Sequence, residues 1–145
     1  MGRWIAIDYG TRRIGLAISD GRARIASPAA VLDAAGTASE DAALVLRWTE
    51  PHEVGGVVVG LPLNMDGSDS AQTRLSRALA DALRARTQLP VELWDERLSS
   101  FQAEEHLVAA GVRPPHRRRR RDALAAQVIL QSFLDARRGG SEAEK

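Results

Sequence analysis

The sequence has no cysteine and only three histidines among its 145 residues. Without cysteine, the protein cannot form disulfides, use a thiolate nucleophile or bind zinc or iron–sulfur clusters through sulfur. His52, His106 and His116 are far apart in the sequence, which argues against a metal site built from histidine. A metal ion, if the protein uses one, would therefore be bound mainly through oxygen atoms.

Long hydrophobic runs are also missing. None approaches the ~18 residues of a membrane span, and Met1–Trp4 does not resemble the start of a secretory signal. With 44% hydrophobic and 27% charged residues, the chain has the composition of a folded protein. We predict a cytoplasmic protein without membrane contact, with one domain over residues 1–138 and a disordered tail over 139–145.

Aromatic residues make up only 4% of the chain, which argues against RNA-binding modules that stack bases on aromatic rings. Lysine is nearly absent too, since Lys145 is the only one, and the positive charge therefore comes from arginine. Part of it forms a cluster without acidic residues, which predicts an anionic partner. The arginines of this cluster are Arg113, Arg117, Arg118, Arg119, Arg120 and Arg121.

Three apolar segments near the start predict an antiparallel meander of strands. They are Trp4–Ile7, Ile14–Ile18 and about Arg24–Leu32, joined by turns that contain glycine. Pro28 lacks the amide hydrogen that a central strand needs, so the third strand is expected at an edge.

Helices and strands then alternate, which predicts parallel strands joined by right-handed crossovers. The expected elements are a helix from Thr37 to about Thr49, a strand over Glu53–Gly60, a helix opened by Asp69 with Gln72, a strand over Val91–Glu96, a helix opened by Ser99 with Gln102, and a last helix from about Arg118 to Arg137. The predicted fold is α/β, with a mixed five-stranded sheet and helices on both faces.

Acidic residues follow several of these strands, where the ligands of such sheets bind. Asp8 ends an apolar run, so its carboxylate needs a partner or a metal ion, although aspartate before a glycine is also common in turns. Asp95 and Glu96 are adjacent and point to opposite faces, so at most one of them can meet Asp8. The alternation does not say which.

Asp122 begins an apolar stripe of the last helix that continues through Ala126, Ile129 and Phe133. The alternative is an acid placed at the helix N-terminus, where the dipole favours negative charge. Carboxylates from distant segments that meet at one edge repel one another unless a cation lies between them. Oxygen ligands favour Mg²⁺ or Mn²⁺, and two such ions beside arginines suit phosphodiester hydrolysis.

Four segments resemble the YqgF/RuvX family: residues 8–15 (DYGTRRIG), 58–67 (VVGLPLNMDG), 95–100 (DERLSS) and 122–130. The resemblance extends over about residues 3–137. It implies an RNase H-like fold and a metal-dependent nuclease whose acidic triad is Asp8, Glu96 and Asp122, so that Glu96 is chosen over Asp95. Family members are described as Holliday junction resolvases and as nucleases that mature the 5′ end of pre-16S ribosomal RNA.

The expected function is therefore processing of pre-16S ribosomal RNA in ribosome biogenesis, with resolution of four-way DNA junctions as the alternative. Asp8, Glu96 and Asp122 are the candidate catalytic residues and ligands of two Mg²⁺ or Mn²⁺ ions. Arg13 joins the arginine cluster as a candidate phosphate contact, and further candidates near the site are Asp95, Asn64 and Arg97. The expected partner is pre-ribosomal RNA or branched DNA, and either a monomer or a homodimer is compatible with the sequence.

Two other functions are compatible with parts of the sequence. Asp8, Gly10, Thr11 and Gly15 also resemble the phosphate loop of actin-like sugar kinases and ATPases, but those proteins close two lobes over a nucleotide and this chain has the length of one. A nucleic-acid-binding or ribosome-assembly factor without catalysis is the second alternative, and cleavage that depends on a divalent cation would distinguish it.

The arginine cluster makes a testable prediction. Each phosphate contact releases counterions, so log affinity falls with log salt by about 0.9 per contact on duplex DNA and about 0.7 on single strands. Replacing Arg117 through Arg120 with serine should flatten this slope by several contacts and weaken binding to all sequences alike. A slope equal to that of the wild type in a titration by fluorescence anisotropy would mean that these arginines only face solvent.

Overall fold

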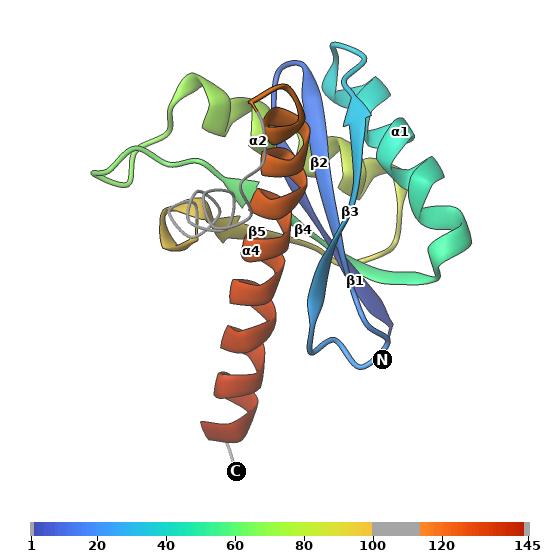
Figure 1. The fold of residues 1–145 in the computed structure, drawn as a ribbon, viewed down its shortest axis with the longest axis vertical. Coiled ribbons are helices and arrows are strands. Elements are labelled where there is room, and N and C mark those ends of the chain that lie inside the picture. The colour runs from blue at the N-terminus through green and yellow to red at the C-terminus, as the bar shows by residue number, and fades with distance from the viewer. Residues whose placement is uncertain (1, 100–113, 144–145) are drawn as a thin grey trace.

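A five-stranded mixed sheet forms the centre of the protein (Figure 1). The computed structural model describes the backbone of residues 2–99 and 114–143 and the side chains of residues 2–99 and 121–139. The strand order is β3-β2-β1-β4-β5. The strands are β1 (Arg3–Tyr9), β2 (Arg13–Ser19), β3 (Ala26–Asp33), β4 (Val54–Leu61) and β5 (Val91–Asp95).

The pairing of the strands confirms the predicted combination of a meander and parallel strands. Strand β2 is antiparallel to β1 and β3, whereas β1 and β4, and β4 and β5, are parallel. Strand β3 lies at the edge, which Pro28 tolerates because the amide hydrogen it lacks is not needed there. The carboxyl ends of β1, β4 and β5 therefore share one edge of the sheet.

Helices cover both faces of this sheet, as predicted. Helices α1 (Ala38–Thr49) and α2 (Ala71–Arg86) lie on one face, and the long helix α4 (Pro114–Ala143) crosses the other (Figure 1). Short 3₁₀ turns, η1 (Glu50–His52) and η2 (Glu96–Leu98), follow α1 and β5. The helix predicted from Ser99 with Gln102 lies in residues 100–113, outside the described part of the chain.

The two capped helices differ in how well the sequence predicted their starts. Thr37 caps α1 as expected, with its side chain accepting a hydrogen bond from the Glu40 amide at 3.1 Å. Asp69 does not cap α2, because Arg77 binds its carboxylate at 2.8 Å. Ser70 caps α2 instead, in a reciprocal pair with Thr73. The prediction of an Asp69–Gln72 cap was therefore wrong by one position.

Helix α4 is longer than the predicted range from about Arg118 to Arg137. It begins at Pro114, because proline fits the first turn of a helix, where its missing amide hydrogen is not needed. It continues past Gly139 to Ala143, so most of the tail that was expected to be disordered is helical. Glycine costs a helix only about 1 kcal/mol per residue and does not oblige it to end. The division into a domain over 1–138 and a tail stays a prediction.

Alternation along the strands divides the core into two layers. In β1, Ile5, Ile7 and Tyr9 pack with α1 and α2, whereas Trp4 and Ala6 pack under α4. Side chains of a strand point alternately to the two faces of the sheet, so Asp8 belongs to the face covered by α4. The same alternation puts Arg13, Gly15 and Ala17 of β2 on that face.

Helix α4 makes its closest approach to the sheet at Gly15. A Cβ atom built on Gly15 would lie 2.2 Å from the carbonyl oxygen of Asp122 and 2.5 Å from its carbonyl carbon. Real Cβ atoms do not come this close to backbone, so only glycine permits this distance between β2 and α4.

We expect Gly15→Ala to destabilise the protein by about 1–3 kcal/mol, the usual cost of overpacking a core, because the helix has to move away. Gly21→Ala is the matched control, since nothing lies within 4 Å of a Cβ atom at that position. Urea denaturation of both variants measures the difference. Equal stabilities would show that α4 does not depend on the space at Gly15.

Candidate active site

Asp8 is half-buried near the carboxyl end of β1, between two glycines. Gly15 lies directly opposite Asp8 on β2, and Gly60 follows Val59, the β4 partner of Ile7. Neither neighbour has a side chain to fill the space beside the carboxylate. Asp8 belongs to the strand and not to the following turn, so the alternative interpretation of Asp8 as a turn residue was wrong.

Glu96 occupies the space over Gly60. It is the first residue of η2, directly after β5, and a Cβ atom on Gly60 would lie 2.9 Å from its Cγ and 2.8 Å from Ile129 Cδ1. Because Gly60 has no side chain, Glu96 reaches Asp8 and the two carboxyl groups share a hydrogen bond. The structure therefore brings Glu96 to Asp8, the residue that the family resemblance selected.

Burial changes the acidity of this pair. Burial raises the pKa of Glu96 to about 8, and the negative charge of Asp8 contributes in the same direction. Burial also raises the pKa of Asp8 to about 6, and the negative charge of Asp122 contributes in the same direction. The hydrogen bond between the pair raises the pKa of Glu96 and lowers that of Asp8, which is the pattern of a Glu96 carboxyl that donates to Asp8. A bound cation would relieve the repulsion between the two carboxylates in the same way as a bound proton does.

Asp122 approaches the pair from α4, beside Gly15, and is held by an arginine. The Arg13 Nε donates a hydrogen bond to Asp122 Oδ2 at 2.6 Å, and both side chains are largely buried, with 31% and 22% exposed. Asp122 lies more than two turns inside α4, which has no acidic residue in its first turn. The alternative interpretation as an N-terminal helix acid was therefore wrong.

The three carboxylates are neighbours, but as they lie in this structure they do not all point to one common metal position. Among the side chains that the structure describes, no three of His, Asp or Glu converge closely enough to hold a metal ion. Asp8 and Glu96 share a hydrogen bond, whereas Asp122 is turned to Arg13. The predicted roles of Asp8, Glu96 and Asp122 as metal ligands stay predictions.

Asp95 has a separate role from its neighbour Glu96. Its carboxylate binds Arg97, with Nη2 and Oδ2 at 2.6 Å, and this hydrogen bond lowers the pKa of Asp95. Arg97 also donates to the carbonyl oxygen of Met65 at 3.2 Å, in the loop after β4. Asn64 closes that loop through its backbone and through its side chain, which donates to Ser68 Oγ. These three candidates thus shape the rim of the site.

The arginine cluster lies mostly outside the described side chains. Arg113 belongs to residues 100–113, and the side chains of Arg117 to Arg120 are also outside the described set. Their backbone belongs to α4, a few residues before Asp122. Arg121, the last of the cluster, is exposed. Contact of these arginines with nucleic acid stays a prediction.

The sequence alone does not show why Gly15 and Gly60 are glycines. Both are located in strands, where glycine is unfavourable without a specific reason, and that was the available signal. The reason is the close approach of Asp122 on one side of Asp8 and of Glu96 on the other.

Comparison with known proteins places this site in a family. The sequence matches the family described as "RuvX: Holliday junction resolvase" over residues 2–136. The chain belongs to the RuvX family. Proteins named "Putative pre-16S rRNA nuclease" are similar over nearly their whole length. One from Anaeromyxobacter sp. (strain Fw109-5) is 47% identical over 93% of this chain and 98% of its own, and one from Chloroflexus aurantiacus is 42% identical over 92% and 87%.

Solved structures show the same fold. The RuvC of T. thermophilus, solved with a Holliday junction substrate, matches 96% of this chain and 97% of its own with a TM-score of 0.54 and 20% identity. The resolvase of Fowlpox virus, also solved with junction DNA, matches 92% and 97% with a TM-score of 0.56 and 10% identity. These likenesses confirm the RNase H-like fold that the resemblance implied.

Membership of the RuvX family makes the chain a nuclease, a hydrolase of phosphodiester bonds, and its substrate a nucleic acid. In the part of the chain that the structure describes, none of the helices has the length and apolar character needed to cross a membrane.

The raised pKa values predict how stability depends on pH. Both groups bind protons more tightly in the folded state, so their contribution to stability is complete below about pH 4 and is lost as the pH rises towards 8. In EDTA, the melting temperature should therefore fall between pH 5 and pH 8.5. A loss of about 1 kcal/mol corresponds to about 3 °C in a domain of this size.

The control for this measurement is Asp8→Asn, which removes one ionisable group and the charge that adds to the effect of burial on the pKa of Glu96, and should make the dependence on pH weaker. Saturating Mg²⁺ or Mn²⁺ should weaken it too if the cation replaces the bound proton. A wild-type melting temperature that rises from pH 5 to pH 8.5 would contradict the prediction.

Proposed function

We propose that this RuvX-family chain hydrolyses pre-16S ribosomal RNA to mature its 5′ end, with Mg²⁺ or Mn²⁺ bound by Asp8, Glu96 and Asp122. The observation that carries the proposal is the close approach of the Asp8 and Glu96 carboxyl groups, over Gly60, beside the Arg13–Asp122 pair. The names of the relatives support ribosomal RNA as the substrate. This function belongs in the cytoplasm, where ribosomes are assembled.

The chemistry of the carboxylates suits a hard divalent cation. All the donor atoms are oxygens. Burial and mutual repulsion raise the pKa values of Asp8 and Glu96, and a bound cation would remove this repulsion. Asp8 and Glu96 would bind the cation directly. Asp122 would become a ligand as well if its carboxylate left Arg13 and turned to the metal ion. When bound, divalent ions supply an activated water and stabilise the leaving oxygen.

The residues of the chain prepare this chemistry in three ways. Gly15 and Gly60 leave the space in which carboxylates from two other segments meet Asp8. Burial raises the pKa of Glu96, so the ionised carboxylate is stabilised when positive charge arrives. Arg13 compensates the charge of Asp122 in the meantime and places a guanidinium beside the carboxylates, where it can bind a phosphate oxygen.

Resolution of four-way DNA junctions is the second candidate, because the family is described by that activity. Symmetric cleavage of a junction needs two active sites and hence a dimer, whereas cleavage at one position of an RNA needs a single site. The oligomeric state in solution therefore bears directly on the choice between the two.

The test compares a pre-16S 5′ leader with a synthetic four-way DNA junction, each with Mn²⁺ and with EDTA. We expect Mn²⁺-dependent cleavage of the leader by the wild type. Asp8→Asn, Glu96→Gln and Asp122→Asn should each lower the rate by at least ~100-fold, because each removes an anionic ligand while its volume is kept.

Asp95→Asn is the matched control, because it neutralises the carboxylate next to Glu96 in the sequence and leaves Asp8, Glu96 and Asp122 unchanged. This variant should keep most of the activity. Cleavage of the junction alone would favour the resolvase. A protein that folds and binds nucleic acid but cleaves neither substrate with Mn²⁺ would favour the assembly factor.

A further inference from the structure

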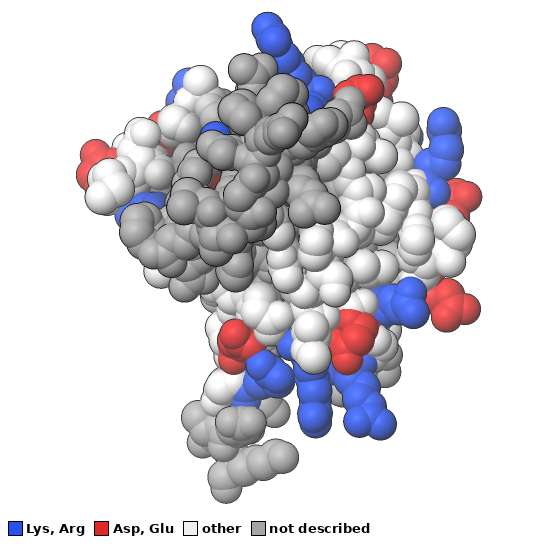
Figure 2. Space-filling model, viewed as in Figure 1, with Lys and Arg blue, Asp and Glu red and all other residues white. Residues whose placement is uncertain are grey.

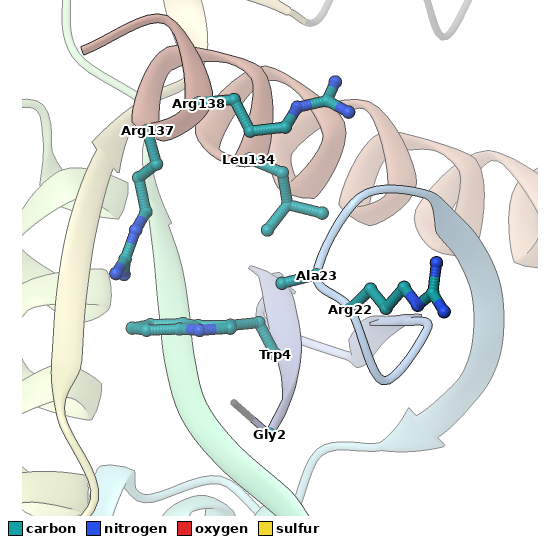
Figure 3. Close-up of a pocket in the computed structure, with 7 residues that line it drawn as sticks. All are labelled: Gly2, Trp4, Arg22, Ala23, Leu134, Arg137 and Arg138. Carbon is teal, nitrogen blue, oxygen red and sulfur yellow. The ribbon is translucent and has the colours of Figure 1, made fainter. Parts of the chain in front are cut away.

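A second basic region lies at the other end of α4, away from the carboxylates. A cavity of about 290 Å³ opens there between the start of β1, the turn that joins β2 to β3, and the last turns of α4 (Figure 3). It is lined by Gly2, Trp4, Arg22, Ala23, Leu134, Arg137 and Arg138. In the space-filling view, basic side chains gather at the lower end of the molecule, near the C-terminus (Figure 2).

Apolar groups line the inner part of the cavity. Trp4 is buried and packs on Phe133, with the two ring centroids 5.0 Å apart, and Leu134 lies beside it. Trp4 is fixed from the other side by the β4 glycine Gly56, on which a Cβ atom would lie 2.6 Å from the indole. This part of the cavity is therefore rigid.

Arginines surround the opening, and two of them are not neutralised. Arg138 is paired with Asp135. Arg137 lies over the Trp4 ring, 4.8 Å from its centroid, and Arg22 is exposed on the opposite side of the cavity (Figure 3). Among the side chains that the structure describes, neither Arg22 nor Arg137 forms an ion pair with a carboxylate.

Two acids near the cavity whose side chains the structure describes, Asp20 and Asp135, are engaged within the protein. Asp20 accepts hydrogen bonds from the backbone amides of Arg24 and Ile25 and so holds the β2–β3 turn together. Asp135 accepts from Gln131 as well as from Arg138. The rim of the cavity thus carries two guanidinium groups without an ion-pair partner among the described side chains, that of Arg137 over Trp4 and that of Arg22, which is directed outward into solvent (Figure 3). Guanidinium groups are complementary to an anion and above all to phosphate.

We propose that this cavity, with Arg22 and Arg137, binds the phosphate backbone of the same nucleic-acid strand that the carboxylates cleave. From Trp4 to Asp8 along β1 the strand rises about 13 Å, and from Leu134 to Asp122 along α4 the helix rises about 18 Å. At 3.4 Å per nucleotide step, this distance corresponds to about four or five steps from the scissile phosphate. The inference rests on the proposed nuclease function.

Binding without a metal ion tests the proposal independently of cleavage. The variant Arg22→Gln with Arg137→Gln removes both charges and keeps part of each side chain, including the stem that covers Trp4. The matched control is Arg47→Gln with Arg86→Gln, which removes two exposed arginines from α1 and α2 on the other face of the sheet. The probe is a fluorescein-labelled pre-16S leader in EDTA, titrated at several salt concentrations.

We expect the cavity variant to lower the slope of log affinity against log salt by about 1.4–1.8, which corresponds to two phosphate contacts. The control variant should keep the wild-type slope. If the cavity variant melts normally but its slope equals that of the wild type, the proposal is overturned. If the double variant does not fold, Arg22→Gln alone replaces it in the same titration.

Substrate length provides a second measurement. With Mn²⁺, the cavity variant should raise the KM of a long leader severalfold at little cost to kcat. On substrates trimmed to two nucleotides beyond the cleavage site on either side, it should behave like the wild type. Equal KM values on long substrates would contradict the inference.

Adenosine 5′-monophosphate distinguishes a strand from a free nucleotide. It should not displace the leader at millimolar concentration, because it offers a single phosphate group. Displacement by the mononucleotide, lost in the cavity variant, would make the cavity a nucleotide site and overturn its role in holding the strand. If the wild type cleaves nothing but the slope still falls, the proposed function fails and the binding surface remains.

Discussion

The candidate site depends on the empty space on either side of Asp8. Gly15 and Gly60 flank this residue on the face of the sheet under α4, and a Cβ atom at either position would collide with the segment that approaches there. Through Gly15 the backbone of Asp122 comes close to β2, and through Gly60 the side chain of Glu96 reaches Asp8. Three carboxylates from three distant segments become neighbours because two side chains are missing.

Electrostatics follow from this crowding. Buried carboxylates so close together cannot all be ionised, and the protein resolves the conflict in two different ways. Asp8 and Glu96 share a hydrogen bond, whereas Asp122 takes a guanidinium, that of Arg13, from the face of β2 that also carries Gly15. Both arrangements reduce the repulsion between the carboxylates.

Helix α4 links the candidate site to the distal cavity. It carries Asp122 near the carboxylates, Arg117 to Arg121 before it and Arg137 beside the distal cavity. Its buried face, with Ala126, Ile129, Leu130 and Phe133, holds it against β1, β2 and β3. The separation between the two basic regions is therefore fixed by a rigid element, and the strand between them would lie along α4.

The sequence by itself determined the strands, the meander, the edge position of β3 and the family, because alternation, turn glycines and the four motifs are local signals. It also marked Asp8 and Asp122 as acids in apolar surroundings. It left Asp95 and Glu96 undecided, because the strand was expected to continue through Glu96, whereas β5 ends at Asp95 and Glu96 begins the 3₁₀ turn that follows. The pairing of Arg13 with Asp122 and the cavity beside Trp4 join residues more than 100 positions apart. Only the packing of α4 on the sheet decided them.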